Sequence, residues 1–207
     1  MNYLEQLIDI SRRYGSDSRY VIAGGGNTSF KTADRLYVKA SGHSLGTITD
    51  QGFAVLDRER LNLIATKQYS DNSIEREAQA AADLLAACVS VGRKPSVETL
   101  LHNVLSSRFV VHLHPTVING LTSSNNVEAE TLRLFGNSVI YVPYADPGYP
   151  LYKSVAAAVE GYVAQYGIEP KAIMLQNHGV FVGADTTEQI ESIYNELVAT
   201  IEGSITM

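Results

Sequence analysis

The sequence predicts a single domain of mixed class, α/β or α+β, in which helices flank one β-sheet. A length of 207 residues suits one elaborated domain. The hydrophobic fraction of 45% and the charged fraction of 18% are those of an ordinary globular chain that can bury a sizeable core. Strand-like and helix-like patterns alternate along the chain, without an internal repeat, a low-complexity tract or a linker. We therefore expect one domain over residues 1–207.

The first third predicts one helix followed by short strands. Apolar residues recur at helical spacing from Leu4 to Ile10, and Gly15 follows, so this helix should end near Tyr14. Short apolar runs then alternate with glycine-rich turns, as in a meander of small strands. The expected strands are RYVIA (19–23), NTSFK (27–31), RLYVKA (35–40) and FAVLD (53–57).

The rest of the chain predicts helices mixed with buried strands. Helical periodicity covers 57–66, 73–91 and 96–107. The run RFVVHLHP (108–115) is β-branched and stopped by Pro115, which is typical of a buried strand, and a helix should begin after Pro115. The remaining expected elements are a strand in 138–148, a helix over 151–167, strands in 171–176 and 179–183, and a terminal helix over 186–203.

Charge and cysteine content exclude several classes of protein. Sixteen Lys and Arg against 22 Asp and Glu leave a net charge of −6 without a basic run, so we expect neither nucleic-acid nor membrane binding. An anionic ligand must then be bound locally. The single cysteine, Cys88, lies in an apolar helical pattern and excludes both an internal disulfide and a cysteine-ligated zinc site. A reducing, cytoplasmic location is expected, since no apolar run reaches 18 residues and the first segment carries Glu5 and Asp9, unlike a signal peptide.

Three histidines form the main candidate for chemistry. His112 and His114 lie two apart on a predicted strand, so their side chains leave the same face near its end. His178, in QNHG, follows another predicted strand. Three neutral imidazoles with an open fourth position are what a catalytic zinc ion requires. The alternative is three hydrogen-bonded histidines without a metal. His102 and His43 are interpreted as structural or peripheral.

The segment GGGNTS (24–29) is a candidate for binding a phosphate. Three glycines permit close backbone approach, and Asn27, Thr28 and Ser29 add short polar groups. The segment is not a Walker loop, and Ser29 occupies the place of the third glycine of a dinucleotide fingerprint. A tight hairpin loop is the alternative interpretation. Two further candidates for an anion are Ser41-Gly42 and the helix start expected after Pro95-Ser96.

Glu98 is the candidate proton donor or acceptor. It follows Ser96 by two residues at the expected helix start, where the simplest explanation is an acidic first-turn residue that complements the helix dipole. A carboxyl group held near bound substrate and metal would instead exchange a proton with the substrate.

Taken together, these segments resemble the class II aldolase/adducin family over nearly the whole chain. The segments that carry the resemblance are GGGNTS (24–29), KASG (39–42), PSVETLLH (95–102), VVHLHP (110–115) and QNHG (176–179), in the family's order. VPYADPG followed by LYKSV is most similar to the aldolase domain that rhamnose-pathway proteins carry ahead of a dehydrogenase domain. The resemblance implies a three-layer fold whose central, mostly antiparallel sheet is flanked by helices.

The resemblance also implies the roles of individual residues. It implies a divalent metal, usually zinc, on His112, His114 and His178, with Glu98 as the catalytic acid or base. It implies substrate phosphate contacts from Gly26, Asn27, Ser41, Gly42 and Ser96. Many members have two serines before the acidic residue, whereas Val97 takes the second place here. The family's catalytic tyrosines are not assigned, although Tyr144, Tyr149 and Tyr152 lie near one such region.

The function that the resemblance implies is metal-dependent retro-aldol cleavage of a ketose 1-phosphate. L-rhamnulose or L-fuculose phosphate would yield dihydroxyacetone phosphate and an aldehyde such as lactaldehyde. Glutamate at position 98 favours an aldolase, because the family's 4-epimerase carries aspartate there. A 4-epimerase, a dehydratase and a non-catalytic adducin-like interaction module are the alternatives. The resemblance further implies a homotetramer with sites between subunits.

Overall fold

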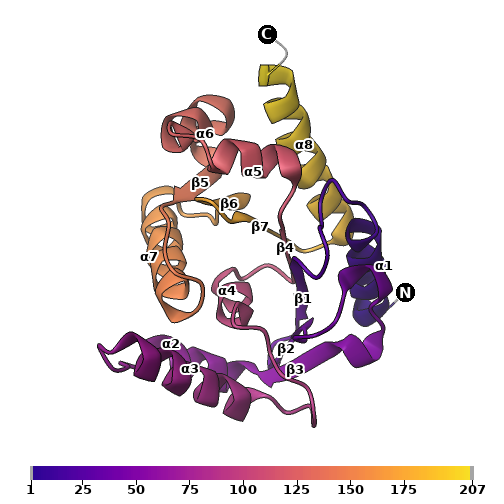
Figure 1. The fold of residues 1–207 in the computed structure, drawn as a ribbon, viewed down its shortest axis with the longest axis vertical. Coiled ribbons are helices and arrows are strands. Elements are labelled where there is room, and N and C mark those ends of the chain that lie inside the picture. The colour runs from indigo at the N-terminus through magenta and orange to yellow at the C-terminus, as the bar shows by residue number, and fades with distance from the viewer. Residues whose placement is uncertain (1, 206–207) are drawn as a thin grey trace.

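A seven-stranded sheet, described over residues 2–205 in a computed structural model, runs through the middle of the molecule (Figure 1). The strand order is β3-β2-β1-β4-β7-β6-β5, and every neighbouring pair is antiparallel except β5 and β6. This arrangement confirms the expected mostly antiparallel sheet. The strands are β1 (Asn27–Lys31), β2 (Arg35–Lys39), β3 (Phe53–Asp57), β4 (Phe109–Leu113), β5 (Val139–Val142), β6 (Ala172–Leu175) and β7 (Gly179–Ala184).

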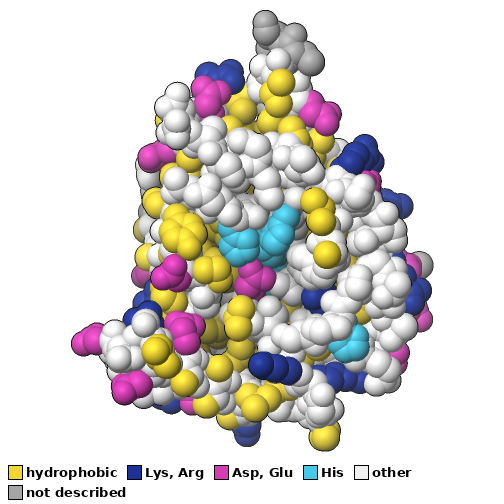
Figure 2. Space-filling model, viewed as in Figure 1, with side chains coloured by type: hydrophobic (Ala, Val, Ile, Leu, Met, Phe, Trp, Pro, Cys, Tyr) yellow, Lys and Arg dark blue, Asp and Glu magenta, His cyan; other side chains and the backbone are white. Residues whose placement is uncertain are grey.

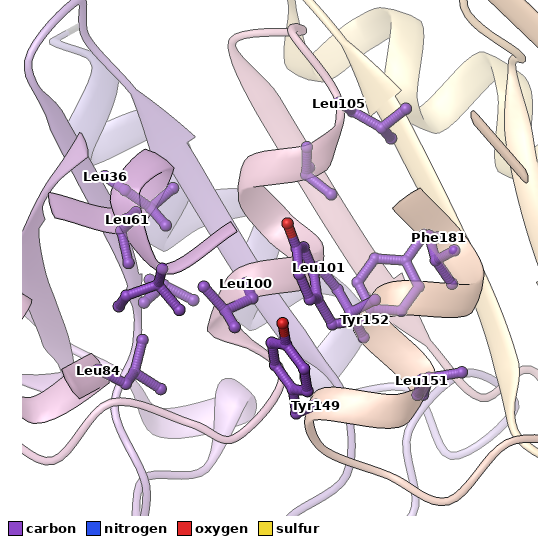
Figure 3. Close-up of a cluster of buried hydrophobic side chains, with 14 of the residues drawn as sticks. Leu36, Leu61, Leu84, Leu100, Leu101, Leu105, Tyr149, Leu151, Tyr152 and Phe181 are labelled. Carbon is purple, nitrogen blue, oxygen red and sulfur yellow. The ribbon is translucent and has the colours of Figure 1, made fainter. Parts of the chain in front are cut away.

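Within the described residues, eight α-helices cover the two faces of the sheet. One apolar cluster packs beneath α1, α5, α6 and α8, and the other beneath α2, α3, α4 and α7 (Figure 1). In the second cluster, Leu100 of α4 lies between Leu36, Leu61 and Leu84 on one side and the tyrosines of α7 on the other (Figure 3). The helices are α1 (Tyr3–Gly15), α2 (Arg58–Thr66), α3 (Ser73–Ala87), α4 (Thr99–Val104), α5 (Thr116–Thr122), α6 (Val127–Phe135), α7 (Tyr149–Tyr166) and α8 (Thr187–Ile205). None of these described helices is both long and apolar enough to cross a lipid bilayer.

Side chains cap the helices where the sequence offers short polar groups. Asn2 and Glu5 form a reciprocal capping box at the start of α1. The Asp57 carboxylate accepts a hydrogen bond from the backbone N–H of Arg60 and starts α2. Asn72 caps α3 in the same way. These caps set the helix starts close to the positions expected from periodicity.

The prediction of a strand at RYVIA (19–23) is wrong. The N–H groups of Tyr20 and Val21 both donate to the Asp17 carbonyl, which makes this segment a turn. The Tyr20 carbonyl instead accepts a hydrogen bond of 3.2 Å from the N–H of His114. The segment therefore fixes the chain that follows β4, because its backbone groups are used outside the sheet.

Helix boundaries also differ from the expectation. Helix α3 stops at Ala87, because Cys88 is extended and forms an isolated β-bridge with Leu56 of β3. The helix expected over 96–107 is restricted to α4, six residues long, and α6 forms where no element is expected. Tertiary pairing overrides helical periodicity at these ends.

Candidate functional site

Three histidines converge where β4 ends and β7 begins. His112 is on β4, His114 follows β4, and His178 lies in the turn between β6 and β7. One ring nitrogen from each lies within 4.8 Å of the other two. Histidine side chains gather near the centre of one face in Figure 2. The structure therefore brings together all three predicted ligands, although His178 is more than 60 residues away in sequence.

Hydrogen bonding orients the ring of His112, and burial keeps the ring of His114 neutral. The Nδ1 of His112 lies 3.1 Å from the Val180 carbonyl oxygen, to which it donates, so its Nε2 faces the cluster. The Nε2 of His114 lies 2.9 Å from the Nε2 of His112. Burial, together with the two neighbouring imidazoles, lowers the pKa of His114 to about 4. A neutral ring at pH 7 offers a lone pair to a cation.

Glu98 lies directly against the cluster. Its Oε1 is 3.0 Å from Nε2 of His178 and 3.5 Å from Nε2 of His112. Its Oε2 accepts a short hydrogen bond from the Asn27 amide. Burial raises the pKa of Glu98, but the two imidazoles outweigh this effect and hold the pKa well below its usual range. The carboxylate is thus ionised beside the imidazoles.

Asn27 joins the histidine cluster to the segment around Ser96. Asn27 is paired with His112 between β1 and β4, so its position is set by the sheet register. Its amide nitrogen is 3.4 Å from the Ser96 hydroxyl. Its amide oxygen is buried without a hydrogen-bond partner among the residues described here. A buried polar atom of this kind suits a ligand hydroxyl or N–H.

The other residues predicted to bind phosphate lie next to this group. The Ser41 hydroxyl donates to the Pro95 carbonyl at 3.3 Å, so the KASG segment contacts the residue before Ser96. A Cβ on Gly26 would lie 3.0 Å from the His112 carbonyl, and its φ of +77° favours glycine. Gly42, with φ of +86°, is exposed beside Ser41.

The prediction that a helix starts at Ser96 is wrong. Helix α4 begins at Thr99, and Glu98 is its N-cap residue. The Ser96 hydroxyl instead accepts a hydrogen bond of 3.3 Å from the N–H of Glu98. Ser96 therefore positions Glu98, and no helix dipole begins at the serine.

The two other histidines lie outside the cluster, as expected. His102 is fully buried, and its Nδ1 lies 2.9 Å from the Ser29 hydroxyl. Burial lowers the pKa of His102 to about 3, so the ring stays neutral in the core. His43 is exposed on the segment that follows Gly42.

Gly179 is a site residue that sequence reasoning missed. A Cβ at this position would lie 2.5 Å from the Leu113 carbonyl oxygen and 2.6 Å from Cδ2 of His114. Gly25 approaches the same ring from another side, since a Cβ added at Gly25 would lie 3.3 Å from Nδ1 of His114. The signal was present in the sequence, because Gly25 lies within GGGNTS (24–29) and Gly179 is the last residue of QNHG (176–179).

The chain matches the family described as Class II Aldolase and Adducin N-terminal domain over residues 5–202. It belongs to the class II aldolase and adducin family.

Relatives of this class II aldolase domain carry several activities in their names. It is 29% identical to the uncharacterized oxidoreductase YuxG of Bacillus subtilis over 96% of this chain, but spans only 28% of that protein's length. It is 26% identical to 3-oxo-tetronate 4-phosphate decarboxylase of Haemophilus influenzae, over 96% of this chain and 88% of the relative. It is 27% identical to L-fuculose phosphate aldolase of Methanocaldococcus jannaschii, over 85% of this chain and 81% of the relative.

A solved structure confirms the fold. The N-terminal class II aldolase domain of a conserved protein from Thermoplasma acidophilum superposes with a TM-score of 0.81 and 29% identity. The match covers 99% of this chain and 94% of that one.

The donor set fits the divalent metal that class II aldolases use. Three imidazoles are borderline ligands suited to a divalent transition ion, and they leave coordination positions open for a substrate. The hydrogen bond from His112 to Val180 is the outer contact that normally fixes a metal-binding imidazole.

Of the tyrosines near the site, Tyr144 is the exposed one. Its backbone N–H donates to the Gln176 side chain at 3.0 Å, which places it beside the turn that carries His178. Tyr149 and Tyr152 are buried, and the Tyr149 hydroxyl donates to the Lys67 carbonyl. Among these three tyrosines, Tyr144 is thus the one whose side chain is mostly exposed.

Proposed function

We propose that this class II aldolase family member cleaves a ketose 1-phosphate to dihydroxyacetone phosphate and an aldehyde. The observation that carries the proposal is the approach of the Glu98 carboxylate to within 3.0 Å of a three-histidine cluster. Relatives named L-fuculose phosphate aldolase support a sugar phosphate as the substrate. L-rhamnulose and L-fuculose 1-phosphates are the proposed substrates.

His112, His114 and His178 would hold the metal, for which zinc is proposed. When bound, a divalent ion supplies Lewis-acid polarisation of the substrate carbonyl. The unpartnered amide oxygen of Asn27 is available to accept a hydrogen bond from a substrate hydroxyl. Gly26, Asn27, Ser41, Gly42 and Ser96 are the proposed phosphate contacts.

Glu98 is the proposed acid and base at carbon 3. In cleavage, the ionised Glu98 carboxylate would accept the proton of the carbon 4 hydroxyl, the bond between carbons 3 and 4 would break, and its electron pair would remain on carbon 3. Glu98 would then deliver this proton to carbon 3. In the condensation direction the ionised carboxylate removes that proton, which is the form its lowered pKa provides. The Asn27 amide and the contacts to His178 orient the carboxylate for both steps.

Decarboxylation of a 3-oxo sugar-acid phosphate is the second candidate. It is favoured by the relative named 3-oxo-tetronate 4-phosphate decarboxylase, 88% of whose length is matched. Loss of carbon dioxide from carbon 2 of such an acid also leaves an electron pair next to a carbonyl, so Glu98 would return a proton in the same way. Release of carbon dioxide instead of an aldehyde distinguishes the two reactions. A 4-epimerase or dehydratase would release neither.

We propose that the protein is a cytoplasmic homotetramer with sites at subunit interfaces. An apolar cleft of about 620 Å³ between α3 and the segment around Val97 supports a neighbouring subunit at this face. Val97 is 59% exposed next to Glu98, so a subunit seated there would shield the site from water. Light scattering on the purified protein measures the number of chains.

Metal content and product analysis test the proposal together. The purified protein should hold about one zinc or similar ion per chain, and His114→Ala should lose it. His43→Ala is the matched control, because it removes an exposed imidazole outside the cluster and should keep the ion. A coupled assay should detect dihydroxyacetone phosphate from rhamnulose or fuculose phosphate.

Glu98→Gln separates catalysis from metal binding. The variant should keep the metal and the fold, while turnover falls by about 100-fold or more. Full activity in this variant would refute the role of Glu98. A protein that takes up no metal after reconstitution would refute the lyase mechanism and favour the adducin-like interaction module.

A further inference from the structure

A buried tyrosine of α8 contacts the two strands that carry the histidine cluster. The side chain of Tyr194 is fully buried, and α8 packs against both β4 and β7. Its hydroxyl donates to the Val111 carbonyl of β4 at 3.0 Å and also lies 3.4 Å from the Val180 carbonyl of β7. Burial raises the pKa of Tyr194, so the hydroxyl keeps its proton and remains a donor. One hydroxyl thus bridges carbonyl oxygens of two adjacent strands.

These two carbonyl groups set the position of His112. The Val111 carbonyl carbon is bonded to the backbone nitrogen of His112. The Val180 carbonyl oxygen accepts the hydrogen bond from Nδ1 of His112 at 3.1 Å. The first group therefore fixes the backbone of this histidine, and the second is the acceptor that orients its ring. The Tyr194 hydroxyl contacts both.

Tyr194 and the His112 ring lie on opposite faces of the sheet. Tyr194 packs with Val111 in the apolar cluster beneath α1, α5, α6 and α8. Successive side chains of a strand alternate between its faces, so His112 points to the other face. There its ring stacks on Phe181, a member of the cluster in Figure 3, with ring centroids 4.0 Å apart and an interplanar angle of 12°. Because strand carbonyls lie within the sheet, the Val180 oxygen is reached from both faces.

The ring of Tyr194 also packs on the segment that holds a second histidine of the cluster. It meets the Tyr20 ring edge-on, with centroids 6.1 Å apart. The Tyr20 carbonyl accepts a hydrogen bond of 3.2 Å from the N–H of His114. A phenylalanine at position 194 keeps a ring for this contact. Replacing Tyr194 by phenylalanine therefore isolates the effect of the hydroxyl.

We propose that Tyr194 is a positioning residue for metal binding, which acts from the opposite face of the sheet on the two carbonyl groups that hold His112. The hydroxyl keeps these carbonyls at the spacing that directs Nε2 of His112 towards the other two histidines. Without it, the Val180 carbonyl can tilt, and the ring loses a fixed acceptor. This inference rests on the proposed function only in taking the three histidines as metal ligands.

The zinc affinity of the metal-free protein tests the inference without any turnover. Titration against a chromophoric chelator should show that Tyr194→Phe binds zinc about 10-fold more weakly, at the lower end of the effect of disturbing an outer contact of a metal ligand. Tyr162→Phe is the matched control, because the Tyr162 hydroxyl of α7 also donates to a backbone carbonyl, that of Asn137, at 2.6 Å. The control should bind zinc with the affinity of the wild type.

Cobalt substitution distinguishes positioning from a general loss of stability. Both variants lose a hydrogen bond from a buried tyrosine, so both should lower the urea midpoint of the metal-free protein. The visible absorption of bound Co²⁺ reports the arrangement of its ligands. At saturating Co²⁺ this spectrum should change in Tyr194→Phe and stay as in the wild type in Tyr162→Phe. A purely structural role would leave both spectra unchanged.

The possible outcomes separate this inference from the proposed function. Zinc affinity that is unchanged in Tyr194→Phe, or weakened equally in Tyr162→Phe, would overturn the inference and leave the proposed reaction standing. A wild type that binds no zinc would overturn both. Conversely, zinc binding that depends on the Tyr194 hydroxyl in a protein without aldolase activity would keep the inference and reject the proposed reaction.

Discussion

Replacing Gly179 by alanine should weaken metal binding although it removes no ligand. The added methyl group would lie 2.5 Å from the Leu113 carbonyl oxygen, which the strand pairing of β4 with β7 holds in place. It would also lie 2.6 Å from Cδ2 of His114 and 3.2 Å from Cε1 of His112. Since the backbone cannot give way, the His114 ring must move.

The expected magnitude follows from these contacts. Overpacking of a buried position costs about 1–3 kcal/mol of stability. Disturbing the orientation of a metal-binding histidine typically lowers affinity by about 10- to 100-fold. Gly179→Ala should therefore show both effects, measured by urea unfolding of the metal-free protein and by zinc titration against a chromophoric chelator.

Gly183→Ala is the matched control on the same strand. Its methyl group would meet the end of the Leu105 side chain at 2.8 Å and the Ser107 hydroxyl at 3.0 Å, both of which can rotate away. Zinc affinity should stay at the wild-type value in this variant. Wild-type zinc affinity in Gly179→Ala, or an equal loss in both variants, would refute the argument that glycine at 179 makes space for the histidine ring.

Three further predictions concern stability. Ser29→Ala should lower the free energy of unfolding by about 1–3 kcal/mol, because it removes the hydrogen-bond partner of the fully buried His102. The other ring nitrogen of His102 already lacks a partner among the described residues. Urea unfolding measures the loss, and an unchanged midpoint would contradict it. Burial lowers the pKa of Lys31 from 10.5 to about 7, so the unfolded chain binds the proton more readily within this window. Stability should therefore rise with pH from 7 to 10, by up to about 1.4 kcal/mol per pH unit relative to Lys31→Met, and parallel pH profiles of the two proteins would exclude this effect. Removing zinc with a chelator should lower the thermal midpoint of unfolding, since a ligand at 1,000 times its Kd adds about 4 kcal/mol to the free energy of unfolding. Calorimetric scans with and without zinc at a fixed activity check this. Equal midpoints would show that no stabilising metal is bound.

Local sequence patterns predicted most of the elements. The β-branched run that ends at Pro115 marked β4, and periodicity marked α7 and α8, because backbone preference and the burial pattern agree in these segments. The expectation failed at RYVIA and beyond Ala87. In both places the backbone forms hydrogen bonds with distant segments, which a local pattern does not contain.

The sequence by itself determined the family and the chemical types of the site residues, because imidazoles, a carboxylate and small polar groups follow one another in a recognisable order. The tertiary structure decided which of them meet. The β4–β7 register carries His178 to within reach of His112, and the end of β2 joins Lys39 to Pro95 through Ala40. It also showed that Gly179 makes space for a ring. Such properties depend on distances between segments far apart in the chain, and these distances exist only once the sheet has formed.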